Sequence, residues 1–158
     1  MVESGPVVVG WREWLALPEL GIPAIKAKID TGARTSALHV DTLDVEDRDG
    51  VTWLRFSVAA TGRRHAPRIE CGAPAIARRT VTDSGGHETL RWFIRTRVEL
   101  GGTGVEVEIN LTDRRNMLFP MLLGRTALSE RFAVVPGLSY RLGRPSFSRK
   151  MLDANRTG

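Results

Sequence analysis

The chain has 158 residues, of which 42% are hydrophobic, so it has enough apolar material for one folded domain and too little for two. Twenty-three Lys and Arg residues outnumber eighteen Asp and Glu residues, and the net charge of +5 favours acidic partners. The single cysteine excludes an intrachain disulfide, and neither a signal-peptide pattern nor a membrane-length apolar stretch is found, so we expect a soluble cytoplasmic protein.

Short runs with high β propensity, most of them bounded by turn-forming residues, follow one another along the chain. They cover residues 6–17, 25–29, 51–60, 75–82, 90–100 and 105–111. In the last run apolar and polar residues alternate at every position, which is typical of a half-buried strand. One short helix is predicted at 125–131. The sequence therefore predicts a single, mainly β domain over residues 1–143 and a flexible basic tail over 144–158.

The predicted strand at 25–29 is followed by an acid, a small hydroxyl residue and a glycine: Asp30, Thr31 and Gly32. Two carboxylates held close together share one proton, so the pair can act as base toward a water and as acid toward a leaving amine. A glycine permits two such turns to approach each other, and the threonine hydroxyl can hydrogen-bond across the pair. Taken alone, however, these three residues more often mark an ordinary strand-end turn.

A second segment far along the chain gives this turn a context. Residues 121–123 are apolar and lead into Gly124 and Arg125, while Ala33 and Ser36 follow the Asp30 turn. This combination resembles the retropepsins, in which an apolar-apolar-Gly-Arg segment runs beneath an Asp-Thr-Gly-Ala loop. The resemblance implies a closed retropepsin-like, or acid protease, β-barrel. It also implies that Asp30, Thr31 and Gly32 are catalytic and that Ser36, Gly124 and Arg125 support the site.

Residues 79–92 are predicted to form a hairpin in the place where retropepsins carry the flap that covers the substrate. The substrate-binding residues implied by the resemblance are Ala33, Arg34, and the predicted hairpin tip Ser84, Gly85 and Gly86. Viral retropepsins usually carry an aspartate at the position of Arg34, paired with the arginine of the Gly-Arg segment. We therefore expect Arg125 to pair with Asp113 or Glu130, and the positive Arg34 to favour an acidic peptide substrate.

A closer resemblance covers nearly the whole chain, on residues 8–14, 26–39 and 121–125. Here the sequence is similar to the bacterial family named ATP-dependent zinc proteases, whose members are associated with RimK-type ATP-grasp ligases that append glutamate to a ribosomal protein. The resemblance implies such a ligase as a partner. No Gly-x-x-x-x-Gly-Lys-Ser/Thr loop occurs in the chain, so ATP dependence would have to come from that partner.

The possible zinc ligands are scattered along the sequence. His39, His65, His87 and Cys71 show neither His-Glu-x-x-His nor any paired spacing, so we predict no metal and no cofactor. His39 is predicted to be a hydrogen-bonded packing residue, and Cys71 a small buried one. The four tryptophans are predicted to be core or interface residues.

One Asp-Thr-Gly per chain cannot supply two carboxylates, so we predict a homodimeric aspartic endopeptidase with Asp30 and its symmetry mate facing each other. Two alternatives stay open: a zinc-dependent metallohydrolase using some of the histidines, Cys71 and Asp30, and a non-catalytic module that binds an acidic peptide or a ligase. Nucleic acid is not an expected partner, because the basic stretch formed by Arg63, Arg64, Arg68, Arg78 and Arg79 has no aromatic residues interleaved.

Overall fold

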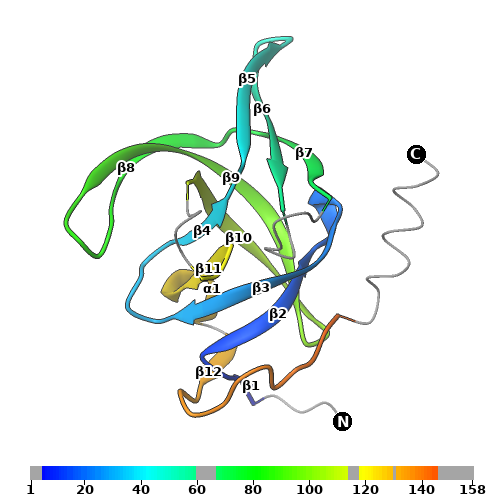
Figure 1. Ribbon diagram of the computed structural model, residues 1–158, viewed down its shortest axis with the longest axis vertical. Coiled ribbons are helices and arrows are strands. Elements are labelled where there is room, and N and C mark those ends of the chain that lie inside the picture. Colours follow the sequence, from blue (N-terminus) through cyan, green and yellow to red (C-terminus); the bar gives the residue numbers. More distant parts are fainter. Residues whose placement is uncertain (1–4, 60–66, 114–117, 130, 146–158) are drawn as a thin grey trace.

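The computed structural model describes residues 5–59, 67–113, 118–129 and 131–145, and these are mostly β (Figure 1). The strands are β1 (Val7–Val9), β2 (Arg12–Leu17), β3 (Ile22–Asp30), β4 (Ser36–His39), β5 (Thr42–Arg48), β6 (Val51–Val58), β7 (Ile69–Pro74), β8 (Ala77–Thr82), β9 (Glu88–Leu100), β10 (Thr103–Thr112), β11 (Met121–Gly124) and β12 (Phe132–Val134). Two short helical turns, η1 (Pro18–Leu20) and α1 (Arg125–Leu128), complete the fold. In this part of the chain, no helix is long and apolar enough to cross a membrane.

The strands β10, β4, β11, β3, β2 and β9 form a continuous sheet that closes where β10 also pairs with β9. The barrel therefore has six strands, with β8 added outside it along β9. A separate sheet of β5, β6 and β7 projects from one end, and β1 pairs in parallel with β12 (Figure 1). The predicted closed retropepsin-like β-barrel with one short α-helix is confirmed.

Alternating side chains of the barrel strands make the core. On β10, Val107, Ile109 and Leu111 are at most 4% exposed, as the alternation in the sequence predicts. They join a single buried apolar cluster to which β2, β3, β9 and β11 also contribute.

The position of β11 in the sheet, between β3 and β4, fixes the loop that carries the candidate site. β11 runs parallel to β3, with Gly124 opposite Asp30, and antiparallel to β4, with Met121 opposite Leu38. The loop that joins β3 to β4 therefore has a neighbour strand common to both of its ends. This arrangement holds residues 31–35 between two fixed points.

Some elements differ from the prediction. The run predicted at 6–17 is two strands, because Trp11 donates its N–H to the Leu138 carbonyl and a side chain on Gly10 would overlap that carbonyl. The helix ends at Leu128 instead of residue 131. β5 was not predicted because most of its side chains are exposed and polar. β7 was not predicted because it contains a glycine and a proline, and Gly72 packs beneath the Trp53 ring.

Candidate active site

Asp30 is the last residue of β3, and its carboxylate closes a tight turn. Oδ1 accepts a hydrogen bond from the Gly32 N–H at 2.9 Å, and the Asp30 carbonyl accepts one from the Ala33 N–H at 3.3 Å. Asp30 is partly buried, while Thr31 and Gly32 are exposed. A fixed carboxylate therefore stands at an exposed turn, where a second molecule can reach it.

Ser36 and Gly124 join the two supporting strands directly beneath this turn. The buried Ser36 hydroxyl accepts the Gly124 N–H at 3.0 Å. A Cβ at position 124 would lie 2.5 Å from the Thr35 carbonyl oxygen and 3.0 Å from that of Ala33. Only glycine fits here without moving the backbone of the loop.

The two residues after Gly124 bind the loop carbonyls. Arg125 donates its backbone N–H to Ala33 at 2.7 Å and its Nη1 to the Thr31 carbonyl at 3.0 Å. Thr126, which the sequence did not single out, donates both its N–H and its hydroxyl to the Arg34 carbonyl, at 3.2 and 2.9 Å. The turn is thus held by four hydrogen bonds from the start of α1.

The acidic partner expected for Arg125 is not found among the described residues. Asp113 instead lies 3.7 Å from His39, and Glu130 lies outside the described part of the chain. The guanidinium binds a backbone carbonyl of the turn, so it needs no carboxylate to stay in place. Of the two partners expected, Asp113 does not pair with Arg125, and Glu130 stays a prediction because it lies outside the described residues.

Asn110 is a further supporting residue that the sequence analysis missed. Its side chain is 1% exposed, and its Nδ2 donates to the Ser36 carbonyl at 2.9 Å. Its Oδ1 accepts Nη1 of Arg91, on β9, at 3.0 Å. Burial lowers the pKa of the Arg91 guanidinium from its ordinary value. The sequence signal for this residue is that Asn110 is an uncharged amide at a polar position of the strand, where the two preceding polar positions, 106 and 108, are glutamates.

Residues 79–92 form the predicted hairpin from β8 and the start of β9, paired from Ala77 opposite Phe93 to Thr82 opposite Glu88. At its tip Asp83 Oδ1 accepts the N–H groups of Gly85 and His87, each at 2.9 Å. These hydrogen bonds lower the pKa of Asp83 from its ordinary value, and the bond from the His87 N–H has the largest effect. Figure 1 shows the hairpin on the same side of the molecule as the β3–β4 turn. Its role as a flap stays a prediction, as do the roles of Ser84, Gly85 and Gly86.

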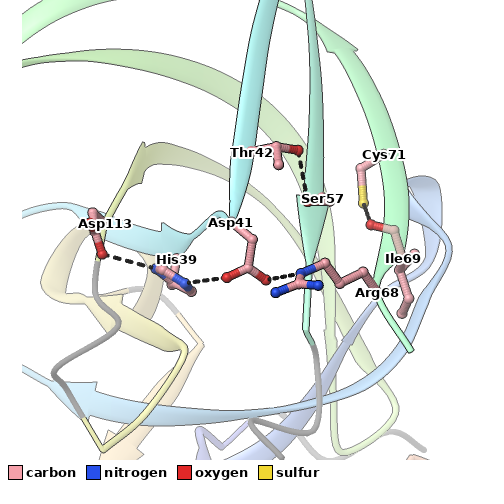
Figure 2. Close-up of polar contacts among 8 residues, drawn as sticks. All are labelled: His39, Asp41, Thr42, Ser57, Arg68, Ile69, Cys71 and Asp113. Carbon is pink, nitrogen blue, oxygen red and sulfur yellow. Dashed lines mark hydrogen bonds and ion pairs between the residues drawn. The ribbon is translucent and has the colours of Figure 1, made fainter. Parts of the chain in front are cut away.

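A second polar group, drawn in Figure 2, lies at the far end of β4. The buried His39 contacts Asp41 through Nε2 at 3.0 Å, and Asp41 accepts Nε of Arg68 at 3.1 Å. Burial opposes ionisation of Asp41, but the bonds from His39 and Arg68 outweigh it, so the pKa of Asp41 is lowered. The prediction that His39 is a hydrogen-bonded packing residue is confirmed.

The described donor residues do not fit a metal ion. His39 lies between Asp41 and Asp113, His87 lies at the hairpin tip, and Cys71 is buried beside the Leu20 and Ile69 carbonyls. Burial raises the pKa of the Cys71 thiol to about 12, so the thiolate that a metal requires is disfavoured. Within the described ranges no three His, Cys, Asp or Glu side chains are grouped to hold a metal, and His65 lies outside them.

A solved structure of similar fold is that of Lpg0085 from Legionella pneumophila, a protein whose function is given as unknown. It matches with a TM-score of 0.72 and 24% identity, over 87% of this chain and 99% of that one. This likeness supports the fold alone.

Relatives by sequence include proteins named probable alpha-L-glutamate ligase. Those of Desulfotalea psychrophila and Shewanella pealeana are each 38% identical to this chain, over 88% and 86% of its length. The chain spans only 30% of each of these relatives.

A family model described as RimB-like, retropepsin-like aspartic endopeptidase RimB, matches residues 8–145. These residues contain the whole barrel, the Asp30 turn and its supports. The chain belongs to the RimB-like family.

Proposed function

We propose that this chain is one half of a homodimeric aspartic endopeptidase that cleaves acidic peptides. The observation that carries the proposal is the Asp30 turn, whose carboxylate is oriented by the Gly32 N–H and whose carbonyls are bound by Arg125 and Thr126. Positioned, rigid groups of this kind are what acid–base catalysis requires. Membership of the RimB-like family supports the same chemistry.

The partner subunit supplies the second carboxylate, because each chain contains a single Asp-Thr-Gly. Two carboxylates held across a two-fold axis share one proton. The ionised one takes a proton from water, and the resulting hydroxyl oxygen bonds to the scissile carbonyl carbon. The protonated one stabilises the carbonyl oxygen, and a proton then passes to the amide nitrogen as the carbon–nitrogen bond breaks. Thr31 braces the two turns, and the β8–β9 hairpin closes over the substrate and excludes bulk solvent other than the reacting water.

The charges near the turn favour an acidic substrate. Arg34 directly follows Ala33 in the loop and is exposed, and Lys28 precedes Asp30 by two residues on β3 and is exposed. Carboxylates of a bound peptide would be attracted to both, with the strength of the attraction falling at high salt.

The relatives suggest which acidic peptide this is. Proteins named glutamate ligases contain a segment similar to this chain as part of a longer polypeptide. An enzyme that adds glutamate and a peptidase that removes it would act on the same chain end. We therefore propose Glu-rich peptides as the substrate and a RimK-type glutamate ligase as a functional partner.

The test is cleavage of a peptide with a tail of glutamates, followed by mass spectrometry, with a glutamine-tailed peptide as the neutral control. Asp30→Asn keeps the size of the side chain and removes the base, so we expect cleavage to fall by about a thousandfold or more. Arg34→Ala should reduce the preference for the glutamate tail over the glutamine tail. Cleavage that survives Asp30→Asn but is lost to a metal chelator would contradict the aspartic mechanism. Binding without cleavage would favour a non-catalytic module.

A further inference from the structure

A second cationic surface lies on the outer face of β2 and β3. In the pairing of these strands, Arg12 is opposite Lys28 and Trp14 is opposite Lys26. The segment after β12 adds Tyr140 and Arg144 to this face. We call the group of Arg12, Trp14, Lys26, Tyr140 and Arg144 the cation–aromatic platform.

Cations and rings alternate in the platform. Cζ of Arg12 lies 4.7 Å from the centre of the Tyr140 ring and 4.5 Å from that of the Trp11 ring. Nζ of Lys26 lies 5.2 Å from Trp14, and Cζ of Arg144 lies 4.7 Å from the same ring. Each contact holds a long cationic side chain in place, which lowers the entropy that it loses on binding a ligand.

A buried carboxylate builds the platform. Glu13, which is 0% exposed, accepts the backbone N–H groups of Gly10, Arg141 and Leu142 at 2.7, 3.1 and 3.1 Å. These bonds hold the segment after β12 against the beginning of β2, where Tyr140 also donates its N–H to the Arg12 carbonyl at 2.9 Å. The only acid of β2 is thus directed inward and used by backbone groups, so it does not neutralise the outer face.

Tyr140, whose ring belongs to the platform, has an unfavourable backbone conformation. Its φ is +51°, in the left-handed region that a bulky side chain rarely enters. Strain of this kind persists where surrounding contacts enforce it and is common at binding sites. The Tyr140 ring contacts two cations of the platform: Cζ of Arg12 and Nζ of Lys26 lie 4.7 and 5.7 Å from its centre.

The charge of the platform is not compensated within the described part of the chain. Neither Arg12, Lys26 and Arg144 nor the neighbouring Lys28 forms an ion pair there. Other faces differ in this respect. Glu108 pairs with Arg79 and Arg95, and Glu46 pairs with Arg48 and Arg55. The platform therefore concentrates positive charge that a ligand can neutralise.

The arrangement favours carboxylates over nucleic-acid bases as ligands. The Trp14 and Tyr140 rings already carry cations on their faces, so they offer little free ring surface for a base to stack on. The guanidinium and ammonium groups can still donate hydrogen bonds to carboxylates. An extended acidic polypeptide fits this pattern of separate cations.

The platform is continuous with the Asp30 turn along β3. Lys26, Lys28 and Asp30 are at every second position of β3, so their side chains lie on the same face of the strand. The four-residue step from Lys26 to Asp30 spans about 13 Å. We propose that the platform binds the acidic stretch of the substrate that lies outside the catalytic cleft. The inference rests on the proposed function for the identity of this acidic chain, but its binding test needs no cleavage.

Binding is measured on the Asp30→Asn background, by fluorescence anisotropy of a labelled peptide of twelve glutamates at low salt. Lys26→Gln with Arg144→Gln should weaken binding by about tenfold, from the loss of two cationic contacts. The matched control is Arg48→Gln with Arg55→Gln, which removes the same charge from the β5–β6 hairpin and should change binding by less than about twofold. Equal weakening by both pairs would overturn the proposal, because it would reflect net charge alone.

Kinetics on the active protein separate this inference from the proposed function. With a long glutamate-tailed substrate, the double variant Lys26→Gln with Arg144→Gln should raise KM about tenfold at unchanged kcat. With a short substrate confined to the cleft, the same variant should leave both KM and kcat unchanged. Cleavage of the long substrate with unchanged KM would overturn the inference and leave the peptidase standing. Tail binding without any cleavage would overturn the peptidase and leave the platform standing. Tighter, platform-dependent binding of a single-stranded RNA oligomer than of the peptide would overturn the choice of ligand.

Discussion

Asp41 shows how a single residue can make the stability of this domain depend on pH. Its carboxylate accepts hydrogen bonds from His39 and Arg68, and its pKa is lowered in the folded state. A group whose pKa is lower when folded stabilises the protein above its unfolded pKa of about 4, and this stabilisation is lost as the pH falls through the folded pKa.

We therefore expect Asp41→Asn to lower the free energy of unfolding by about 1–2 kcal/mol at pH 7, through the loss of charged hydrogen bonds. The variant should also lose less stability than the wild type between pH 6 and pH 3. Urea unfolding at the two pH values measures both effects. Asp44→Asn removes the same charge from an exposed position on β5 and should change little. An identical pH dependence in wild type and Asp41→Asn would contradict the argument.

Among single residues, the sequence predicted best those whose contacts are local. Asp30, Thr31 and Gly32 form one turn, and their types and order are visible in three adjacent positions. The placement of Ser36 and Gly124 came from the resemblance, because their contact spans 88 positions. Asn110 and Thr126 were missed because their partners lie 74 and 92 positions away in the sequence. Arg125 binds the Thr31 carbonyl where a pair with Asp113 or Glu130 was expected.

At the scale of an element, the β8–β9 hairpin depends on one side chain at its tip. Asp83 accepts two backbone N–H groups there, and no apolar packing replaces them because the tip is exposed. Asp83→Ala should therefore loosen the tip and weaken its closure over a substrate. We expect kcat/KM to fall about fivefold or more, because the two backbone N–H groups at the tip lose their shared acceptor.

Thermal unfolding should change little in Asp83→Ala, since the core lies elsewhere. Asp83→Asn keeps an oxygen acceptor of the kind that such turns prefer, and should restore most of the activity. Peptide cleavage together with the melting temperature distinguishes these outcomes. Unchanged kcat/KM in Asp83→Ala would remove the hairpin from the mechanism.

Elements with a clear period or a clear turn were predicted well, and those shaped by tertiary contacts were not. The alternation of β10 and the turn residues at Ser84 to Gly86 are both local signals, and both elements are found. The break between β1 and β2 was not predicted, because it arises where Gly10 and Trp11 meet Leu138. A contact of this length leaves no local pattern in the sequence.

At the scale of the whole molecule, the proposed two-carboxylate site makes activity depend on association. Specific activity should fall as the protein is diluted below its dimer dissociation constant, and the fall should coincide with dissociation measured by sedimentation. An equal mixture of wild type and Asp30→Asn, exchanged to equilibrium, should keep about one quarter of its dimers fully wild type. Activity that simply halves, or that does not change on dilution, would indicate a site complete within one chain.

The ends of the described chain are joined to each other. β1 pairs with β12, and Glu13 binds backbone groups 128 and 129 positions further along. Contacts of such long sequence separation require the closure of large loops before they stabilise anything, so folding should be slow, in the range of milliseconds to seconds. During synthesis, the buried carboxylate of Glu13 must wait for its partners until nearly all of the domain has left the ribosome. Until then the beginning of β2 stays without its cover, and this strand is where we expect a nascent chain to be most exposed to misfolding.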